Sequence, residues 1–233
     1  MGRLGNSKAK WLLAAGLLTG ITSFDLAYSQ DKAPEPARTK LLLTIERWKK
    51  DGWEAANAQS VFKPQDRLRF RFRTSISGYL YILNQASSGK TSWIYPLKDT
   101  HPDEVTEGHE IIIPNTEGSF VVGGPPGFDT LYWIMRSTPF EVHEIPADKL
   151  DLPSTLISRC PEETSETQVT CLDENAGPKA VTDTKKLQSA IGLPGSLVAR
   201  DLTFEATSKA TEISTASDGA SDGIMYQLKI AHN

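Results

Sequence analysis

The segment RLRFRFR, Arg67–Arg73, decides the fold class of this 233-residue chain. Basic and apolar residues alternate strictly, so a β-strand places Leu68, Phe70 and Phe72 on one face and the arginines on the other, about 6.8 Å apart. Such a strand belongs to a sheet with one face on a core and one in water. The segment therefore predicts a layered β-structure.

Short strand-like segments recur between Gly, Pro and Asn clusters from Lys40 to Glu144. This spacing is typical of an all-β sandwich or barrel rather than of βαβ units. Residues 78–83 are apolar on both faces, which predicts a central strand, and 85–89 predict a hairpin turn. We expect seven strands here, at 41–47, 68–74, 79–83, 91–95, 110–113, 119–122 and 130–136.

The composition changes after Glu144. Residues 145–196 are rich in Pro, Glu, Thr and Asp, so we expect a polar insertion with one short helix at 185–191, stopped by Gly192 and Pro194. Strand patterns return at 197–205 and 224–230, separated by a Ser/Thr/Ala-rich segment, 206–223, that we expect to be mobile. The C-terminal residues 197–233 should pack on the domain formed by 40–144. The expected fold is an all-β, immunoglobulin-like β-sandwich with a mobile, disulfide-bearing C-terminal elaboration.

The N-terminus predicts export. Basic residues from Arg3 to Lys10 precede an apolar run at 11–21, and Ala27-Tyr28-Ser29 offers the small residues of a signal peptidase site. The run is about half of the ~20 residues that span a bilayer, so a cleaved signal at 1–29 is favoured over an uncleaved anchor. Residues 30–39 then form a flexible lead-in. We expect a periplasmic or secreted protein without stable membrane insertion after cleavage.

The two cysteines agree with export. Cys160 and Cys171 flank a polar loop, and an oxidising compartment favours their pairing in a disulfide. Redox catalysis or zinc binding is the less favoured alternative, because the spacing is not C-x-x-C and two thiols are too few ligands for zinc.

Charge and motifs restrict the function further. Twenty-five Lys and Arg against 29 Asp and Glu leave a net charge of -4, which argues against general binding to nucleic acid or anionic membranes. No H-E-x-x-H motif occurs, and the S-x-x-K spacing at Ser60 runs into Pro64 rather than along a helix. We therefore expect no catalytic residues, no metal site and no cofactor.

Two groups of side chains are candidate binding residues. The first is the arginine row of the strand, which could meet a polyanion or an acidic peptide, although pairing with carboxylates of a neighbouring strand is the simpler interpretation. The second is an aromatic set that could stack on sugars or a peptide, although core packing is the commoner role. The candidates are Arg67, Arg69, Arg71, Arg73, Tyr79, Tyr81, Trp93 and Tyr95, with Tyr132 and Trp133 completing the aromatic set.

Several segments in order resemble the bacterial domain of unknown function 4384 (DUF4384). They are 62–70, 78–84, Tyr95-Pro96, Ile113-Pro114, 125–127 and Asp129. The resemblance covers about 40–144, and 200–202 and 224–232 are similar to the family's C-terminal continuation. Gln65 replaces a usual glycine, and the cysteine-bearing insertion is a second departure. Such domains occur in exported proteins beside caspase-like peptidases or protein kinases, so the resemblance implies an accessory module and transfers no catalytic residue.

These observations together predict a non-catalytic interaction or sensing module of the bacterial cell envelope. We expect it to bind an envelope protein through a strand edge or through the arginine row. The alternative is a carbohydrate-binding module that recognises cell-wall glycan through Trp93 and Tyr95.

Overall fold

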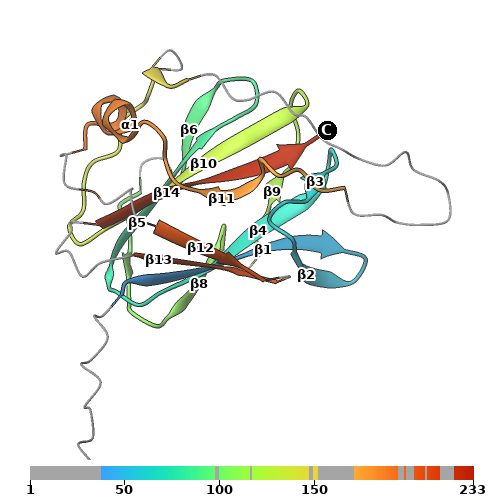
Figure 1. Cartoon of the computed structure of the whole chain (residues 1–233), viewed down its shortest axis with the longest axis horizontal. Helices are drawn as coiled ribbons and strands as arrows, with labels where there is room; N and C mark the ends of the chain where they lie inside the picture. Colours follow the sequence, from blue (N-terminus) through green and yellow to red (C-terminus); the bar gives the residue numbers. More distant parts are fainter. Residues whose placement is uncertain are drawn as a thin grey trace, which may run out of the picture. The chain divides into compact units, whose positions relative to one another are not determined.

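The computed structural model describes residues 38–97, 100–115, 117–146, 149–151, 171–193, 197, 202–207, 209–215 and 223–233. These residues form two β-sheets and one helix (Figure 1). The predicted signal segment, most of the lead-in, Cys160 and the segment 198–201 lie outside the described residues.

The first sheet contains seven strands in the order β12-β13-β1-β4-β8, with β2 paired to β1 and β9 paired to β4. All of its printed pairings are antiparallel. The strands are β1 (Lys40–Lys49), β2 (Gly52–Ala56), β4 (Arg67–Thr74), β8 (Glu110–Ile113), β9 (Phe120–Val121), β12 (Leu202–Ala206) and β13 (Thr211–Thr215).

The second sheet also contains seven strands, in the order β11-β14-β10-β5-β6, with β7 paired to β5. The short strand β3 pairs with β14 in parallel, whereas the other pairings are antiparallel. The strands are β3 (Val61–Phe62), β5 (Gly78–Gln85), β6 (Thr91–Tyr95), β7 (Glu104–Val105), β10 (Gly127–Arg136), β11 (Gly177–Lys179) and β14 (Gly223–His232).

The main hydrophobic core lies between the two sheets. Leu68, Phe70 and Phe72 of β4 are buried in it, as the alternation predicts. Trp133 of the second sheet is fully buried, with its ring centroid 5.6 Å from that of Phe70 and 5.4 Å from that of Phe72. Tyr226 of β14 stacks on the same indole at 6.0 Å. The all-β, two-sheet architecture is therefore confirmed.

A second hydrophobic cluster covers the other face of the second sheet. Helix α1 (Thr184–Ile191) contributes Leu187 and Ile191, which cluster with Tyr81, Ile134 and Met225 of the sheet. The helix begins where the Asp183 carboxylate accepts a hydrogen bond from the Lys186 backbone N–H, and it ends at Gly192, whose φ of 70° suits a residue without a Cβ. Strand β5 is apolar on both faces, and both are covered: one face lies in the main core and the other lies in the cluster that contains α1.

Every strand expected from the sequence overlaps an observed strand, and the expected helix forms. The mobility expected for 206–223 is wrong for Thr211–Thr215, which forms β13 and pairs with β1. Its Ile213 is fully buried, so one apolar residue among threonines and serines is enough to anchor the strand. The interpretation of 145–196 as merely polar is also corrected, because Ile145, Leu150 and α1 supply the second cluster.

The described helix is too short and too polar to span a membrane, and no other helix of the described residues qualifies.

Candidate functional site

The outward face of the first sheet carries the predicted arginines. None of the hydrophobic clusters formed by the described residues includes this face. Its apolar members reach solvent, with Leu42 38%, Trp48 39% and Val121 56% exposed. We call it the arginine face, defined by Leu42, Thr44, Glu46, Trp48, Trp53, Arg67, Arg69, Arg71, Arg73, Glu110 and Val121.

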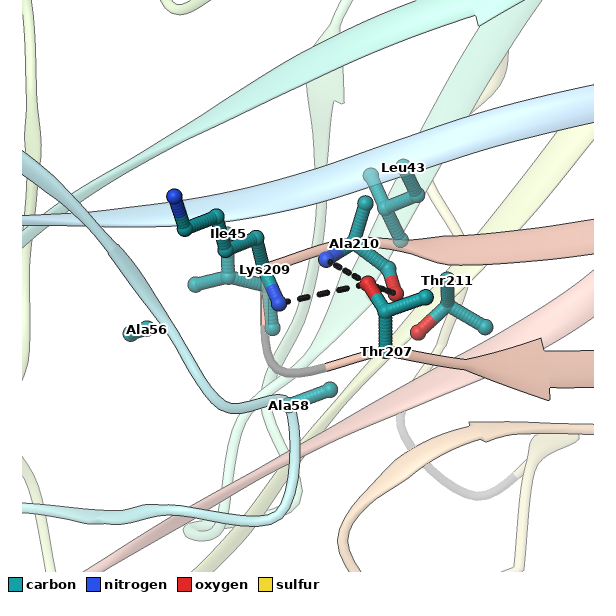
Figure 2. A pocket seen from close by; sticks show the side chains of 8 residues that line it. All are labelled: Leu43, Ile45, Ala56, Ala58, Thr207, Lys209, Ala210 and Thr211. Carbon is teal, nitrogen blue, oxygen red and sulfur yellow. Dashed lines mark hydrogen bonds between the residues drawn. The ribbon is translucent and has the colours of Figure 1, made fainter.

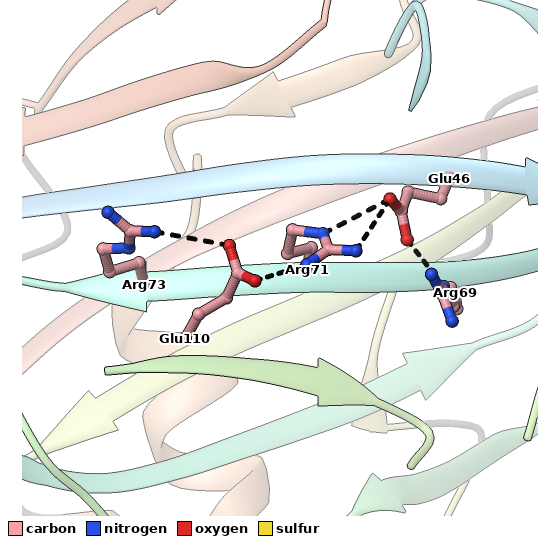
Figure 3. A network of polar contacts seen from close by, with 5 residues as sticks. All are labelled: Glu46, Arg69, Arg71, Arg73 and Glu110. Carbon is pink, nitrogen blue, oxygen red and sulfur yellow. Dashed lines mark hydrogen bonds and ion pairs between the residues drawn. The ribbon is translucent and has the colours of Figure 1, made fainter. Parts of the chain in front are cut away.

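Three of the four arginines form one network with two glutamates of neighbouring strands (Figure 3). Arg69 Nε donates to Glu46 Oε2 at 2.6 Å, and Arg71 Nη2 donates to Glu46 Oε1 at 3.2 Å. Arg71 also donates to Glu110, which raises the pKa of its guanidinium, and Arg73 Nη2 lies 3.5 Å from Glu110 Oε2. The strand register causes this pairing, because Glu46 lies opposite Arg69 and Glu110 lies opposite Arg73. The simpler interpretation, pairing across the sheet, therefore describes these three side chains.

Two tryptophans complete the face at the end of β1. Trp48 and Trp53 lie opposite each other in the β1–β2 hairpin, with ring centroids 5.3 Å apart in an edge-to-face arrangement. The Arg69 guanidinium lies 4.4 Å above the Trp53 ring, and that of Arg67 lies 5.8 Å from the Trp48 ring. Both geometries fall within the range of cation–π attraction.

The sequence reasoning missed this tryptophan pair. It did not predict the β1–β2 hairpin, and so it had no reason to place Trp48 beside Trp53. The signal that could have found it is the Asp51-Gly52 dipeptide, a typical hairpin turn, between two segments that each carry a tryptophan.

Arg67 differs from the other three arginines. Its Nε donates to Ser119 Oγ at 2.9 Å, and its side chain is exposed. Within the described part of the chain it has no carboxylate partner. The terminal Nη donors of this guanidinium therefore remain available to an anion from outside.

The aromatic candidates do not form an open platform. Tyr81 and Trp133 are fully buried on opposite faces of the second sheet. Tyr81 Oη accepts a hydrogen bond from the Phe140 backbone N–H at 2.8 Å, and burial raises the pKa of this tyrosine. Trp93 is partly buried in the second cluster, where its Nε1 donates to the His143 carbonyl at 2.7 Å.

The remaining aromatic candidates are divided between the two cores. Tyr79 and Tyr132 pack against the second cluster, and burial raises the pKa of Tyr132 to about 12. Tyr95 packs against the main core, where burial also raises its pKa. The structure thus brings Trp93 and Tyr95 onto one strand but on different faces, so they do not share a surface.

The predicted disulfide is only half described. Cys171 packs with Val61, Phe128 and Ala231, and its carbonyl accepts a hydrogen bond from the Val61 N–H at 2.8 Å. Cys160 lies outside the described residues. The pairing therefore stays a prediction.

One buried histidine contacts an acid. His232 Nε2 lies 3.3 Å from Asp129 Oδ1, and this hydrogen bond raises the pKa of the imidazole. The same carboxylate oxygen accepts the Ser87 backbone N–H at 2.7 Å. Nucleophilic catalysis would require the serine hydroxyl on the histidine, whereas here the amide and the imidazole share the acid. The arrangement joins β14 and β10 to the β5–β6 turn.

Two hollows of the described surface lie near β1. Figure 2 shows a pocket between β1 and the turn that joins β12 to β13, where Thr207 Oγ1 accepts the Ala210 N–H at 3.0 Å. Its volume of about 10 Å³ is room for about one water molecule. A groove of about 270 Å³ lies at the Leu42 and Arg73 end of the arginine face. Its cations are already paired, since Lys40 contacts Glu212 at 2.9 Å.

Residues 61–139 match the family described as Domain of unknown function (DUF4384). This segment is similar to the DUF4384 family. It includes β3 to β10, and therefore the arginine row of β4 and the buried Trp133. The predicted family is confirmed over these residues.

Both tryptophans of the arginine face lie outside the DUF4384 match, because β1 and β2 precede residue 61. Helix α1 and the C-terminal strands follow it. The chain matches no curated protein and no solved structure. No group of three potential metal ligands occurs among the residues that the structure describes.

Proposed function

We propose that this protein is an exported, non-catalytic interaction module of the bacterial cell envelope that binds a protein partner through the arginine face. The observation that carries the proposal is the difference between the two outer faces of the sandwich. Helix α1 and its neighbours cover the outer face of the second sheet, whereas the arginine face keeps exposed apolar residues beside arginines.

The residue types of this face suit a protein partner. Tryptophan and arginine are enriched among the residues that dominate protein–protein binding energy. The carboxylates of Glu46 and Glu110 hold three arginines in place, so few side-chain rotamers need to be ordered on binding. A partner would therefore meet a largely preorganised surface.

A strand edge is a weaker candidate for the same function. The strands at the ends of the two sheets are β12, β8, β11 and β6. They have five, four, three and five residues, so each could form few main-chain hydrogen bonds with an added strand. We therefore place the partner on the face.

Export and the finer fold class are parts of the proposal. Export rests on the signal-like pattern of residues 1–29 and on the expected Cys160–Cys171 disulfide, which needs an oxidising compartment. The two antiparallel sheets, with one parallel β3–β14 pairing, support an immunoglobulin-like sandwich. N-terminal sequencing of the protein from an envelope fraction should begin at Gln30.

Recognition of cell-wall glycan ranks second. A sugar stacks on an open aromatic face, but the Arg69 guanidinium already lies 4.4 Å above the Trp53 ring. Trp93, the residue first expected to bind sugar, has its indole N–H bonded to a backbone carbonyl.

Site-specific photocrosslinking tests the proposed function. A benzophenone amino acid is introduced at Leu42 or at Val121, both on the arginine face, and at Leu97, which is 62% exposed elsewhere. In the cells that produce the protein, we expect one protein adduct from both face positions and none from Leu97. Adducts with glycan only, or the same adducts from all three positions, would contradict binding of a protein through this face.

A further inference from the structure

The arginine face is not uniform in charge. Its four arginines face two glutamates, and these glutamates contact only Arg69, Arg71 and Arg73. The positive charge of Arg67 is left without a carboxylate in the described residues. This excess lies on a chain whose net charge is -4, so the basic spot contrasts with its surroundings.

Apolar surface surrounds the same guanidinium. Val121 of β9 lies opposite Arg67 in the strand register and is 56% exposed. Trp48, 39% exposed, lies on the other side with its ring 5.8 Å from Arg67 Cζ. A single anchor site therefore combines a cation, an indole and an aliphatic side chain. We call Arg67, Trp48 and Val121 the anchor corner.

We infer that the anchor corner binds an acidic segment of the protein partner, in which a Glu or Asp carboxylate pairs with Arg67 and a neighbouring apolar or aromatic side chain packs on Trp48 and Val121. This inference rests on the proposed function and names the chemistry of its partner. The carboxylate would take both Nη donors in the planar geometry that favours arginine over lysine.

The geometry around Arg67 supports this assignment. Its Nε is held by Ser119 Oγ at 2.9 Å, which orients the guanidinium, and no carboxylate of the described residues takes its terminal nitrogens. Apolar surface on both sides lowers the local dielectric once a partner covers it, and a charge-assisted hydrogen bond is then stronger than in water. A neutral or basic segment would bury the guanidinium without a partner, at a cost.

A peptide display experiment with the full chain tests the inference. A library of random 12-residue peptides is selected against the wild-type protein, and enriched peptides are measured again with variants. We expect an acidic residue beside an aromatic or aliphatic one. Arg67→Ala should weaken binding about tenfold, and Trp48→Ala about 30-fold. Leu97→Ala is the matched control, an exposed apolar residue outside the arginine face, and should change nothing.

A charge exchange makes the test specific. Arg67→Glu should abolish binding of the enriched peptide, and replacing the peptide's acidic residue with arginine should restore it. The urea midpoint of Arg67→Glu should stay near that of wild type, because among the described residues Arg67 contacts the Ser119 hydroxyl and the Trp48 ring and no carboxylate.

Peptides without an acidic residue, peptides insensitive to Arg67→Glu, or a library without enrichment would each overturn the inference. The proposed function would still stand if photocrosslinks from Leu42 and Val121 capture a protein. Failure of both experiments would remove the function together with its partner chemistry.

Discussion

Glu46 and Arg69 lie directly opposite each other on β1 and β4, with Arg69 Nε 2.6 Å from Glu46 Oε2 and 10% of each side chain exposed. Arg71 shares the same carboxylate. The outward face of the first sheet thus contains a nearly buried ion pair. Removing either residue would leave the charge of the other in a poorly hydrated place.

Glu46→Ala is therefore expected to destabilise the fold. The loss leaves Arg69 largely buried without this carboxylate and should lower the free energy of unfolding by about 3 kcal/mol. Urea denaturation measures the change. Glu54→Ala is the control, because Glu54 pairs with Lys49 at 3.3 Å while 61% of its side chain is exposed, and it should leave the urea midpoint almost unchanged. Equal effects of the two variants would contradict the structural role of the Glu46 pair.

Leu187→Ala should reveal how much the packing of α1 contributes to the free energy of unfolding. Leu187 is buried in the second cluster against the outer face of the second sheet, so its truncation should cost about 2–5 kcal/mol. It should also increase binding of a hydrophobic dye, since Tyr81 and Met225 lose cover. Lys185→Ala, an exposed position of the same helix, should change neither stability nor dye binding.

The His232–Asp129 contact predicts a pH dependence. The hydrogen bond to Asp129 raises the pKa of the imidazole in the folded protein above 6.5. The contribution of this contact to the stability of the fold is therefore complete below pH 6.5 and is lost as the pH rises through the folded pKa. Wild type should exceed His232→Gln in Tm by a larger margin at pH 5.5 than at pH 8.5. Exposed His101→Gln should show no such trend, and a pH-independent margin for His232→Gln would disprove the linkage.

Substitutions at two glycines test how closely β14 approaches β10 beside Arg136. A Cβ on Gly223 would lie 2.0 Å from the Met135 carbonyl oxygen and 2.9 Å from Leu197 Cδ2. Gly223→Ala should therefore force β14 away from β10 and cost about 1–3 kcal/mol. Gly123→Ala meets nothing within 4 Å and should be close to neutral in the same thermal melt.

The presence of most strands could be predicted from the local alternation of apolar and polar residues, because this alternation relates side chains only two residues apart. The alternation of β4 and the two apolar faces of β5 were sufficient for that purpose. Strand β13 escaped prediction because only Ile213 marks its inward face, and pairing with β1 stabilises it. The β1–β2 hairpin escaped prediction because its local signal is a single dipeptide, Asp51-Gly52.

The candidate site was harder to predict than the strands. The arginine row was found, since β4 alone defines it. Its partners were not, because Glu46 and Glu110 reach it only through the register of three strands. Tyr81 and Trp133 are core residues, and the other aromatic candidates pack partly buried against the two clusters.

The sequence by itself determined that the chain is β-rich, that residues 61–139 are similar to the DUF4384 family, and that β4 has a basic face. These properties follow from residue type and from a period of two, which are local. Only the tertiary structure decided which arginines are neutralised and which sheet face is covered. Both depend on contacts between residues far apart in the chain, such as Arg69 with Glu46 and Tyr81 with Phe140, and such contacts exist only after the sheets have paired.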